Sequence, residues 1–269
     1  MKIFLSCLFL LVTMNARATC QFRPEIKKVI SLSGPMTVLL QEMGLIEQHV
    51  VKGISVFSPV SAKTYKGKLY PGGVFLAPST LEEFSLGLVF YDESRDLKKI
   101  LKSKKNINSV EIKTRHLLPM DVVDRTMVII KSYVSGCDIE LSAVKTKAIG
   151  IQKDLLRRVP DGMNVVFFLG EIRGSRLPEL VVVNDGIVKL LLQEKKINTY
   201  PSELSYINWS PKIMSSMPSK TLLIGLVDSG MKGVKKVETS LNKTNLFYPG
   251  SLVPGLTQLE AFHFWLKSL

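Results

Sequence analysis

The sequence predicts an α/β protein made of two lobes, each with a mainly parallel sheet covered by helices, joined by one long helix. Strand-like and helix-like segments alternate along most of the chain, as they do when helices connect parallel strands. A helical run of about 20 residues interrupts this alternation near the middle. Because 269 residues suffice for two separately cored lobes, we expect a first lobe over residues 19–136, a linking helix over 137–159 and a second lobe over 160–269.

The first eighteen residues have the pattern of a secretory signal peptide. Lys2 precedes the apolar run 3–14, and Ala16 and Ala18 put small residues where a signal peptidase reads the chain. The apolar run is about a dozen residues long, whereas a membrane-spanning helix needs roughly 20, which disfavours a membrane anchor. We therefore expect the chain to be exported and cleaved near Ala18.

Strand–turn–helix units predict the first lobe. An apolar run ends at Ser33-Gly34-Pro35, and the helix that follows has proline in its first turn and stops at Gly44. Ser79 to Glu83 offers two overlapping capping boxes for a short second helix. The predicted strands are 28–32, 50–57, 86–91 and 110–113, and the other predicted helices are 35–43 and 94–104.

One apolar stripe predicts the linking helix, which follows a shorter helix over 122–134. From Asp138 onward, apolar residues recur at steps of three or four, which describes one face of a helix about 30 Å long. The residues of this stripe are Leu141, Val144, Ala148, Ile151 and Leu155. Pro160-Asp161-Gly162 ends the run, so we expect a continuous helix long enough to cross a small domain.

Alternation resumes in the second lobe. Ser210 before Pro211 caps a short helix, and Thr257 to Glu260 provides a capping box for the last one. The predicted strands are 164–169, 221–227 and 246–248, and the predicted helices are 186–194, 210–217, 231–241 and 257–269.

The net charge and the cysteine content indicate which kinds of binding partner and which cellular compartment to expect. The formal net charge is +13, but the lysines are scattered and an exported protein rarely meets nucleic acid, so we expect solvated helix faces and no nucleic-acid partner. Cleavage would leave two cysteines, Cys20 and Cys137. In an oxidising compartment they are read as one disulfide from the mature N-terminus to the middle of the chain, with two unpaired thiols as the alternative.

Metal-site and enzyme motifs are missing from the sequence. His49, His116 and His263 are the only histidines and have no metal-ligand spacing, so neither a metal site nor another cofactor is predicted. There is no Gly-x-Ser-x-Gly elbow, Walker loop or complete dinucleotide fingerprint. Ser142 to Lys145 has the spacing of a serine–lysine acyl-transfer motif but lies within the apolar stripe, which favours chance. We expect a binding protein rather than an enzyme.

Several segments together resemble the class III periplasmic substrate-binding proteins that deliver iron-siderophores, heme or cobalamin to ABC importers. The matching residues are 28–33 with Thr37, Leu40 and 43–45, then 53–56, 79–83 leading into 88–90, 165–170, Trp209-Ser210 and 222–224. The resemblance implies two Rossmann-like lobes on a rigid backbone helix. It also implies a periplasmic monomer that captures a small molecule, including metal chelates, and hands it to an ABC permease of the inner membrane. The alternative is a non-transport envelope protein that uses its basic surface to bind an anionic partner.

The resemblance also implies how the lobes would dock. In the family, a glutamate on each lobe tip contacts arginines of the permease. Glu82 or Glu83 fits this position on the first lobe, whereas Lys212 stands near it on the second. A lysine there would repel a permease arginine, so we expect an altered permease contact or a loss of transport.

Strand ends and loop aromatics are the candidate ligand contacts, because ligands of open α/β sheets bind beyond the carboxyl ends of the strands. Aromatic rings suit a flat or macrocyclic ligand, and Arg173 could hold a carboxylate or phosphate at two points. The candidates are Ser33, Gly34, Ser58, Tyr91, Arg173, Tyr206, Trp209 and Tyr248. The alternative is that these residues bind no ligand: the small residues would only close turns, and the aromatic side chains would only pack within loops.

Overall fold

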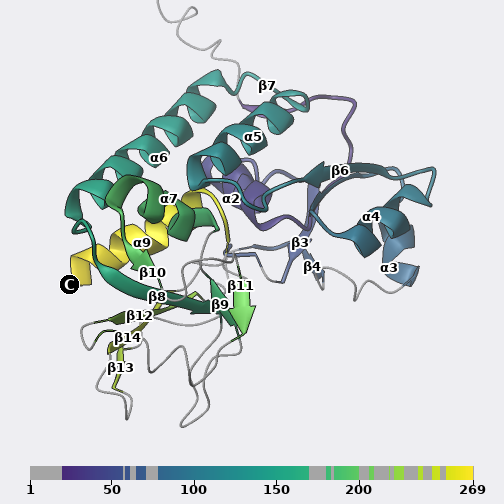
Figure 1. Cartoon of the computed structure of the whole chain (residues 1–269). Helices are drawn as coiled ribbons and strands as arrows, with labels where there is room; N and C mark the ends of the chain where they lie inside the picture. The colour runs from purple at the N-terminus through teal and green to yellow at the C-terminus, as the bar shows by residue number, and fades with distance from the viewer. Residues whose placement is uncertain are drawn as a thin grey trace, which may run out of the picture.

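The computed structural model shows an α/β protein with two main sheets and a layer of helices (Figure 1). It describes residues 20–56, 58–60, 65–70, 78–169, 180–182, 185–199, 206–208, 218, 221–226, 236–238, 244–248 and 253–268. The signal segment and the predicted helix over 210–217 lie outside these residues. Within the described part of the chain, no helix has the length and hydropathy to cross a membrane.

The first sheet has five strands in the order β4-β3-β2-β5-β6, and every neighbouring pair is parallel. Its strands are β2 (Val29–Ser31), β3 (Val51–Ser55), β4 (Lys68–Tyr70), β5 (Leu88–Asp92) and β6 (Asn108–Ile112). Its connecting helices are α2 (Gly34–Glu42), α3 (Pro78–Glu83) and α4 (Arg95–Lys102). The parallel alternation is confirmed, but β4 forms where the sequence predicted only a loop.

The edge strand β4 forms because a glycine on its neighbour leaves room for an aromatic ring. A Cβ atom on Gly53 would lie 2.1 Å from Cε2 of Tyr70, so only glycine lets this ring cross the backbone of β3. Tyr70 is buried there and packs edge-on against Phe84, with ring centroids 5.1 Å apart. The burial of one tyrosine therefore fixes an otherwise polar segment as a strand.

The second sheet is mixed, with the order β11-β9-β8-β12-β14-β13 and β10 paired to β8. Its strands are β8 (Asn164–Leu169), β9 (Leu180–Val182), β10 (Asn198–Thr199), β11 (Tyr206–Asn208), β12 (Leu222–Leu226), β13 (Lys236–Glu238) and β14 (Thr244–Tyr248). β8, β10, β12 and β14 run parallel, while β9 and β13 are antiparallel to their neighbours.

The prediction of a helix over 231–241 was wrong at β13. Val237 of this strand pairs with Asn245 of β14, so backbone pairing with a distant segment overrides the helical preference of the surrounding lysines.

Four helices pack into one layer: α5 (Pro119–Lys131), α6 (Asp138–Arg158), α7 (Gly186–Lys195) and α9 (Leu256–Ser268). α6 is the predicted long helix, continuous over 21 residues, and it buries Leu141, Val144, Ala148 and Leu155 of the predicted stripe. It runs beside α5 and α9 (Figure 1). The helical spine is therefore confirmed.

The expectation of separate cores was wrong. One cluster of buried apolar residues extends from Phe22 through α2, α5 and α6 to Leu266. α9 brings this about, because its buried side, which includes Leu259 and Phe262, packs along α6 and also reaches α2. A second, smaller cluster lies under α3 and α4, on the other side of the first sheet. Both sheets are thus attached to one shared helical core.

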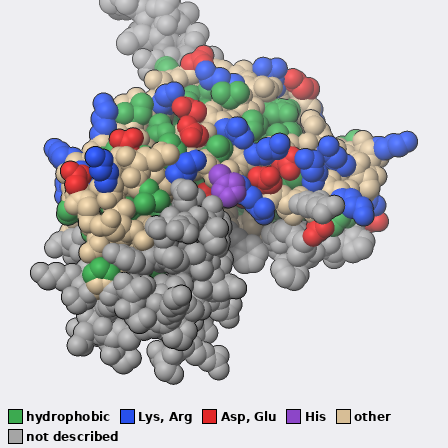
Figure 2. All heavy atoms as spheres, in the orientation of Figure 1, with side chains coloured by type: hydrophobic (Ala, Val, Ile, Leu, Met, Phe, Trp, Pro, Cys, Tyr) green, Lys and Arg blue, Asp and Glu red, His purple; other side chains and the backbone are tan. Residues whose placement is uncertain are grey.

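A disulfide joins Cys20 to Cys137, across 117 residues of sequence. Next to it, β1 (Gln21–Phe22) pairs antiparallel with β7 (Val134–Ser135). The N-terminal end of the described chain is thereby fixed to the start of α6. On the face drawn in Figure 2, Lys and Arg side chains lie over the helix layer and over the α3–α4 end.

Candidate functional site

The carboxyl ends of three neighbouring parallel strands define the candidate site in the first lobe. β3, β2 and β5 lie side by side, so the residues after them meet at one edge of the sheet. Ser33 and Gly34 follow β2, Ser58 follows β3, and Asp92 ends β5. The structure brings these four residues to the common edge that the sequence predicted.

Ser33 and Gly34 form the turn from β2 into α2. The Ser33 hydroxyl accepts a hydrogen bond from the Met36 N–H at 3.3 Å and so caps the helix. The Ser33 carbonyl accepts from the Thr37 hydroxyl at 2.7 Å. The Gly34 N–H donates to Oδ2 of Asp92 at 3.1 Å, which places a carboxylate at the positive end of α2. Helix capping is sufficient to explain the presence of Ser33. The hydrogen bond from Gly34 to Asp92, in contrast, connects the turn after β2 to the end of β5.

Asp92 is the titratable group of this edge. Burial raises the pKa of its carboxyl group to about 6, and the Ser33 hydroxyl and the Gly34 N–H oppose that rise. Oδ1 of Asp92 is buried and has no hydrogen-bond partner among the described residues. An unsatisfied carboxylate oxygen at a strand end is a group that a ligand or a water molecule could satisfy.

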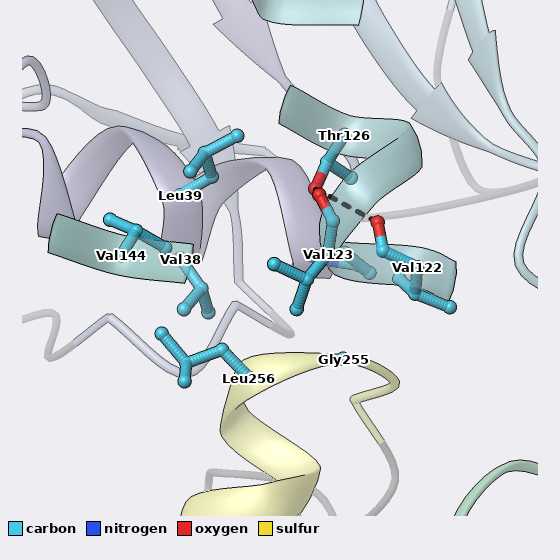
Figure 3. A pocket seen from close by; sticks show the side chains of 9 residues that line it. Val38, Leu39, Val122, Val123, Thr126, Val144, Gly255 and Leu256 are labelled. Atoms are coloured by element: carbon cyan, nitrogen blue, oxygen red, sulfur yellow. Dashed lines mark hydrogen bonds between the residues drawn. The ribbon is translucent and has the colours of Figure 1, made fainter. Parts of the chain in front are cut away.

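A residue from the far end of the chain covers the turn. A Cβ atom on Gly34 would lie 3.0 Å from Cγ1 of Val253, which precedes α9. Beside it, side chains from α2, α5, α6 and the start of α9 converge on a small space (Figure 3). That space measures about 10 Å³ and is lined by apolar groups, including Val38, Val144 and Leu256. This space is too small for a ligand. It is a contact where helices of the first lobe pack against α6 and the start of α9.

Ser58 and Tyr91 have structural roles in this conformation. The Ser58 hydroxyl accepts from the Val60 N–H at 3.3 Å and so closes its own turn. Tyr91 is 1% exposed and lies in the small cluster under α4, on the opposite side of β5 from Phe90. Because side chains alternate along a strand, the ring of Tyr91 packs the core and is not open to a ligand.

Strand ends also line up in the second lobe. The register forms one row across β11, β9, β8, β12 and β14, made of Asn208, Leu180, Leu169, Leu226 and Tyr248 in that order. Tyr206 begins β11 and Tyr248 ends β14, but their side chains are not described. Arg173, Trp209 and Lys212 lie outside the described residues. By sequence, Trp209 directly follows β11 and Arg173 comes four residues after the end of β8.

The two candidate docking glutamates differ in their surroundings. Both oxygens of Glu83 lie 2.6 Å from Nζ of Lys68, and Oε2 also accepts from the Tyr70 hydroxyl at 2.9 Å. These contacts lower the pKa of Glu83, the hydrogen bond from Lys68 most of all. The side chain of Glu82 is exposed and makes no hydrogen bond or ion pair within the described ranges. Glu82 is therefore the glutamate that a partner could contact.

Among the described residues, no group of three or more metal-ligating side chains comes together. The three histidines occupy separate places: His49 is exposed, the backbone N–H of His116 donates to Asp185, and Nδ1 of His263 lies 3.3 Å from Oδ2 of Asp154. Asp92 was expected among the strand ends at this edge, because it follows a predicted strand, but it was not chosen as a candidate ligand contact.

Comparison with known proteins gives the same fold at low sequence identity. No family model and no curated protein sequence matches the chain. The periplasmic heme-binding protein HutB of Vibrio cholerae has a TM-score of 0.67 and 15% identity, covering 91% of this chain and 98% of that chain.

Two further solved structures are similar over the same length. The periplasmic heme-binding protein RhuT of Roseiflexus has a TM-score of 0.64 and 15% identity over 90% of this chain and 97% of that chain. The periplasmic vitamin B12-binding protein BtuF of Vibrio cholerae has a TM-score of 0.62 and 12% identity, with coverage of 90% and 97%. The chain therefore has the two-lobed α/β fold, built on a long helix, of periplasmic heme- and vitamin B12-binding proteins.

Proposed function

We propose that the mature chain is a periplasmic solute-binding protein that captures a heme-, iron-siderophore- or cobalamin-like ligand and delivers it to an ABC importer. The observation that carries this proposal is the fold similarity over about nine-tenths of the chain to proteins named for binding heme and vitamin B12. A further structure in this group is a siderophore-binding protein with ferric acinetobactin bound. In this proposal residues 1–18 are removed and the protein acts as a monomer, with lobes over 19–136 and 160–269.

The proposed ligand lies between the carboxyl ends of the two sheets. In the first lobe, the polar groups at the strand ends are Asp92, whose Oδ1 has no partner among the described residues, and the backbone around Gly34. In the second lobe, Tyr206, Trp209 and Tyr248 would stack on a flat ligand, and Arg173 would bind its carboxylate. The shared core and the continuous α6 favour small movements of the lobes, because repacking this core would expose apolar side chains.

Native mass spectrometry of the protein purified from its own periplasm tests the proposal. We expect a bound small molecule of the heme, ferric siderophore or cobalamin class, and saturable binding when hemin, cyanocobalamin or a ferric siderophore is added. Trp209→Ala and Arg173→Ala should weaken that binding, whereas Phe264→Ala on the exposed side of α9 should not. If nothing co-purifies and none of the three probes binds, the proposal is wrong.

One observation favours the second candidate, a non-transport envelope protein. Glu83 is neutralised by Lys68, so the first-lobe tip presents less negative charge than the docking scheme requires. Uptake by cells separates the two functions. Glu82→Ala should reduce ligand uptake while leaving ligand binding intact if the protein serves an importer. Unchanged uptake in cells that lack the protein would favour the second candidate.

A further inference from the structure

One residue of the first lobe is held by the second lobe through both of its backbone polar groups. The His116 N–H donates to Oδ1 of Asp185 at 3.0 Å, and the His116 carbonyl accepts from Nζ of Lys189 at 3.0 Å. His116 lies in the loop over residues 113–118, between β6 and α5, whereas Asp185 caps α7 and Lys189 lies one turn into that helix. We call these two contacts the His116 clasp.

The backbone of His116 has an uncommon conformation within the clasp. Its φ angle is +60°, in the left-handed region that favours glycine. The Leu117 N–H donates to the Thr114 carbonyl at 3.3 Å, which closes a turn with His116 at the third position, where a positive φ usually requires glycine. A strained residue of this kind persists where surrounding contacts hold it. The His116 side chain is exposed, so the contacts to its backbone hold the residue in place.

On the side of the first lobe, the loop is fixed to α5 at both of its ends. Arg125 donates to the Lys113 carbonyl at 3.3 Å. The Leu118 N–H donates to Oδ2 of Asp121 at 3.3 Å. The loop therefore moves with α5 and cannot follow α7 without giving up these hydrogen bonds.

On the side of the second lobe, the first turn of α7 is fixed to α9. The Ile187 N–H donates to Oε1 of the buried Gln258 at 3.1 Å. A Cβ atom on Gly186 would lie 2.8 Å from the same oxygen, so glycine lets this side chain approach. Oδ1 of Asp185 accepts from the Gly186 N–H at 2.8 Å as well as from His116, so one oxygen caps α7 and holds the loop. A movement of α7 relative to α5 must therefore strain or break the clasp.

The clasp lies along the same sheet edge as the candidate site. β6 pairs parallel with β5, so the loop after β6 leaves the sheet at the edge where Asp92 ends β5. Elsewhere the two halves meet through apolar contacts, such as that of Val253 with Gly34. Apolar contacts are non-directional, whereas two hydrogen bonds to one residue fix both a distance and an orientation.

We propose that the His116 clasp is a conformational stop that sets the resting separation of the two lobes. When α7 moves away from α5, the two hydrogen bonds break and His116 relaxes to a negative φ angle. The loop beside the candidate site then changes conformation, so the position of the second lobe is coupled to the shape of this edge. The clasp needs no ligand, so it can fail while the proposed transport function holds, and the reverse is equally possible.

Amide exchange tests whether the clasp holds the loop. NMR of the isotope-labelled protein would measure the exchange of the residue-116 amide proton with water. We expect Lys189→Met to accelerate this exchange about tenfold, because loss of one contact lets the strained backbone open. Gln193→Met, at an exposed position on the same helix, should leave the rate unchanged. Equal rates in Lys189→Met and the unmodified chain overturn the proposal.

Distances between the lobes test the coupling. Spin labels on Lys102→Cys of α4 and Glu194→Cys of α7, both at exposed positions, would report the separation by pulsed electron paramagnetic resonance. The disulfide between Cys20 and Cys137 stays intact in this experiment. We expect Lys189→Met to give a broader distribution that extends to longer distances than that of the unmodified chain.

Two substitutions at the clasped residue separate the backbone from the side chain. His116→Val should broaden the distance distribution as Lys189→Met does, because a β-branched residue disfavours a positive φ angle. His116→Gly should keep the distribution of the unmodified chain, because glycine accepts this φ angle and the clasp uses only backbone atoms of the residue. Unchanged distributions in both Lys189→Met and His116→Val overturn the proposal, since the contacts would then order the loop without setting the lobe separation.

Discussion

Nζ of Lys147 on α6 lies 2.7 Å from Oε1 of Glu260 on α9. The same ammonium group lies 2.8 Å from Oε2 of Glu42, at the end of α2. One cation therefore joins three helices, one from each half of the chain and the spine between them. Burial lowers the pKa of Lys147, but the hydrogen bonds that its ammonium group donates to Glu260 and Glu42 outweigh this effect and raise the pKa.

Lys147→Met should destabilise the protein by about 1 kcal/mol, because the pairs are partly exposed and surface ion pairs contribute little each. The thermal midpoint should fall by about 2–4 °C. Since the folded-state pKa of Lys147 is raised, its stabilisation is present at neutral pH and disappears as pH rises through that pKa. The difference between the two proteins should therefore shrink in strongly alkaline buffer, which thermal unfolding at several pH values would measure. Lys153→Met, at an exposed position on α6, should change the midpoint little at any pH.

Asp92→Asn should stabilise the protein at pH 7.5. The folded-state pKa of Asp92 is about 6, above its usual value of 3.8, so the folded protein pays to ionise this carboxyl group. That cost is absent below pH 4, develops between pH 4 and 6, and is complete above 6. A rise of about 2 pKa units corresponds to about 3 kcal/mol, and loss of the charged hydrogen bond from the Gly34 N–H should offset part of the gain in Asp92→Asn.

Urea denaturation at pH 4 and pH 7.5 would measure this effect of Asp92. The unmodified chain should lose stability from this group as pH rises, and Asp92→Asn should lack that component. Glu25→Gln, at an exposed position, serves as the control because it keeps Asp92. An identical pH dependence in Asp92→Asn and Glu25→Gln would contradict the assignment.

Gly34→Ala and Gly150→Ala should have different effects, although both glycines lie in helices. At Gly150 on α6 no atom lies within 4 Å of an added Cβ, so alanine should stabilise the helix by about 0.5–1 kcal/mol. At Gly34 the new methyl group meets Val253 at 3.0 Å and must displace it, which should cancel this gain. Combining Gly34→Ala with Val253→Ala should show coupling in chemical denaturation. Strict additivity would mean that Val253 does not press on the turn.

Removal of the disulfide should lower the free energy of unfolding by about 2–4 kcal/mol, because the bond closes a long loop in the unfolded chain. The double variant Cys20→Ser/Cys137→Ser would measure this by urea denaturation. Reductant should lower the thermal midpoint of the unmodified chain and leave that of the double variant unchanged. An equal response of both proteins to reductant would show that the bond does not form in solution.

Local sequence signals predicted the elements that depend on near neighbours in the chain. The apolar stripe from Leu141 to Leu155 was sufficient for α6, because a helix forms and buries one face through residues three and four apart. Ser33, Pro35 and Gly44 bounded α2 for the same reason. The sequence also placed Ser33, Ser58 and Asp92 at one edge of the sheet, because the carboxyl ends of neighbouring parallel strands lie at the same edge.

The sequence by itself determined the α/β class, the long helix and the edge where the strands of the first lobe end. Tertiary structure alone decided that Val237 joins a strand, that Tyr91 faces the core and that Val253 covers Gly34. It also decided the shared core and the position of Lys147 between Glu42 and Glu260. The physical reason is that these features depend on contacts between segments far apart in the chain, whose pairing follows from packing and not from local periodicity.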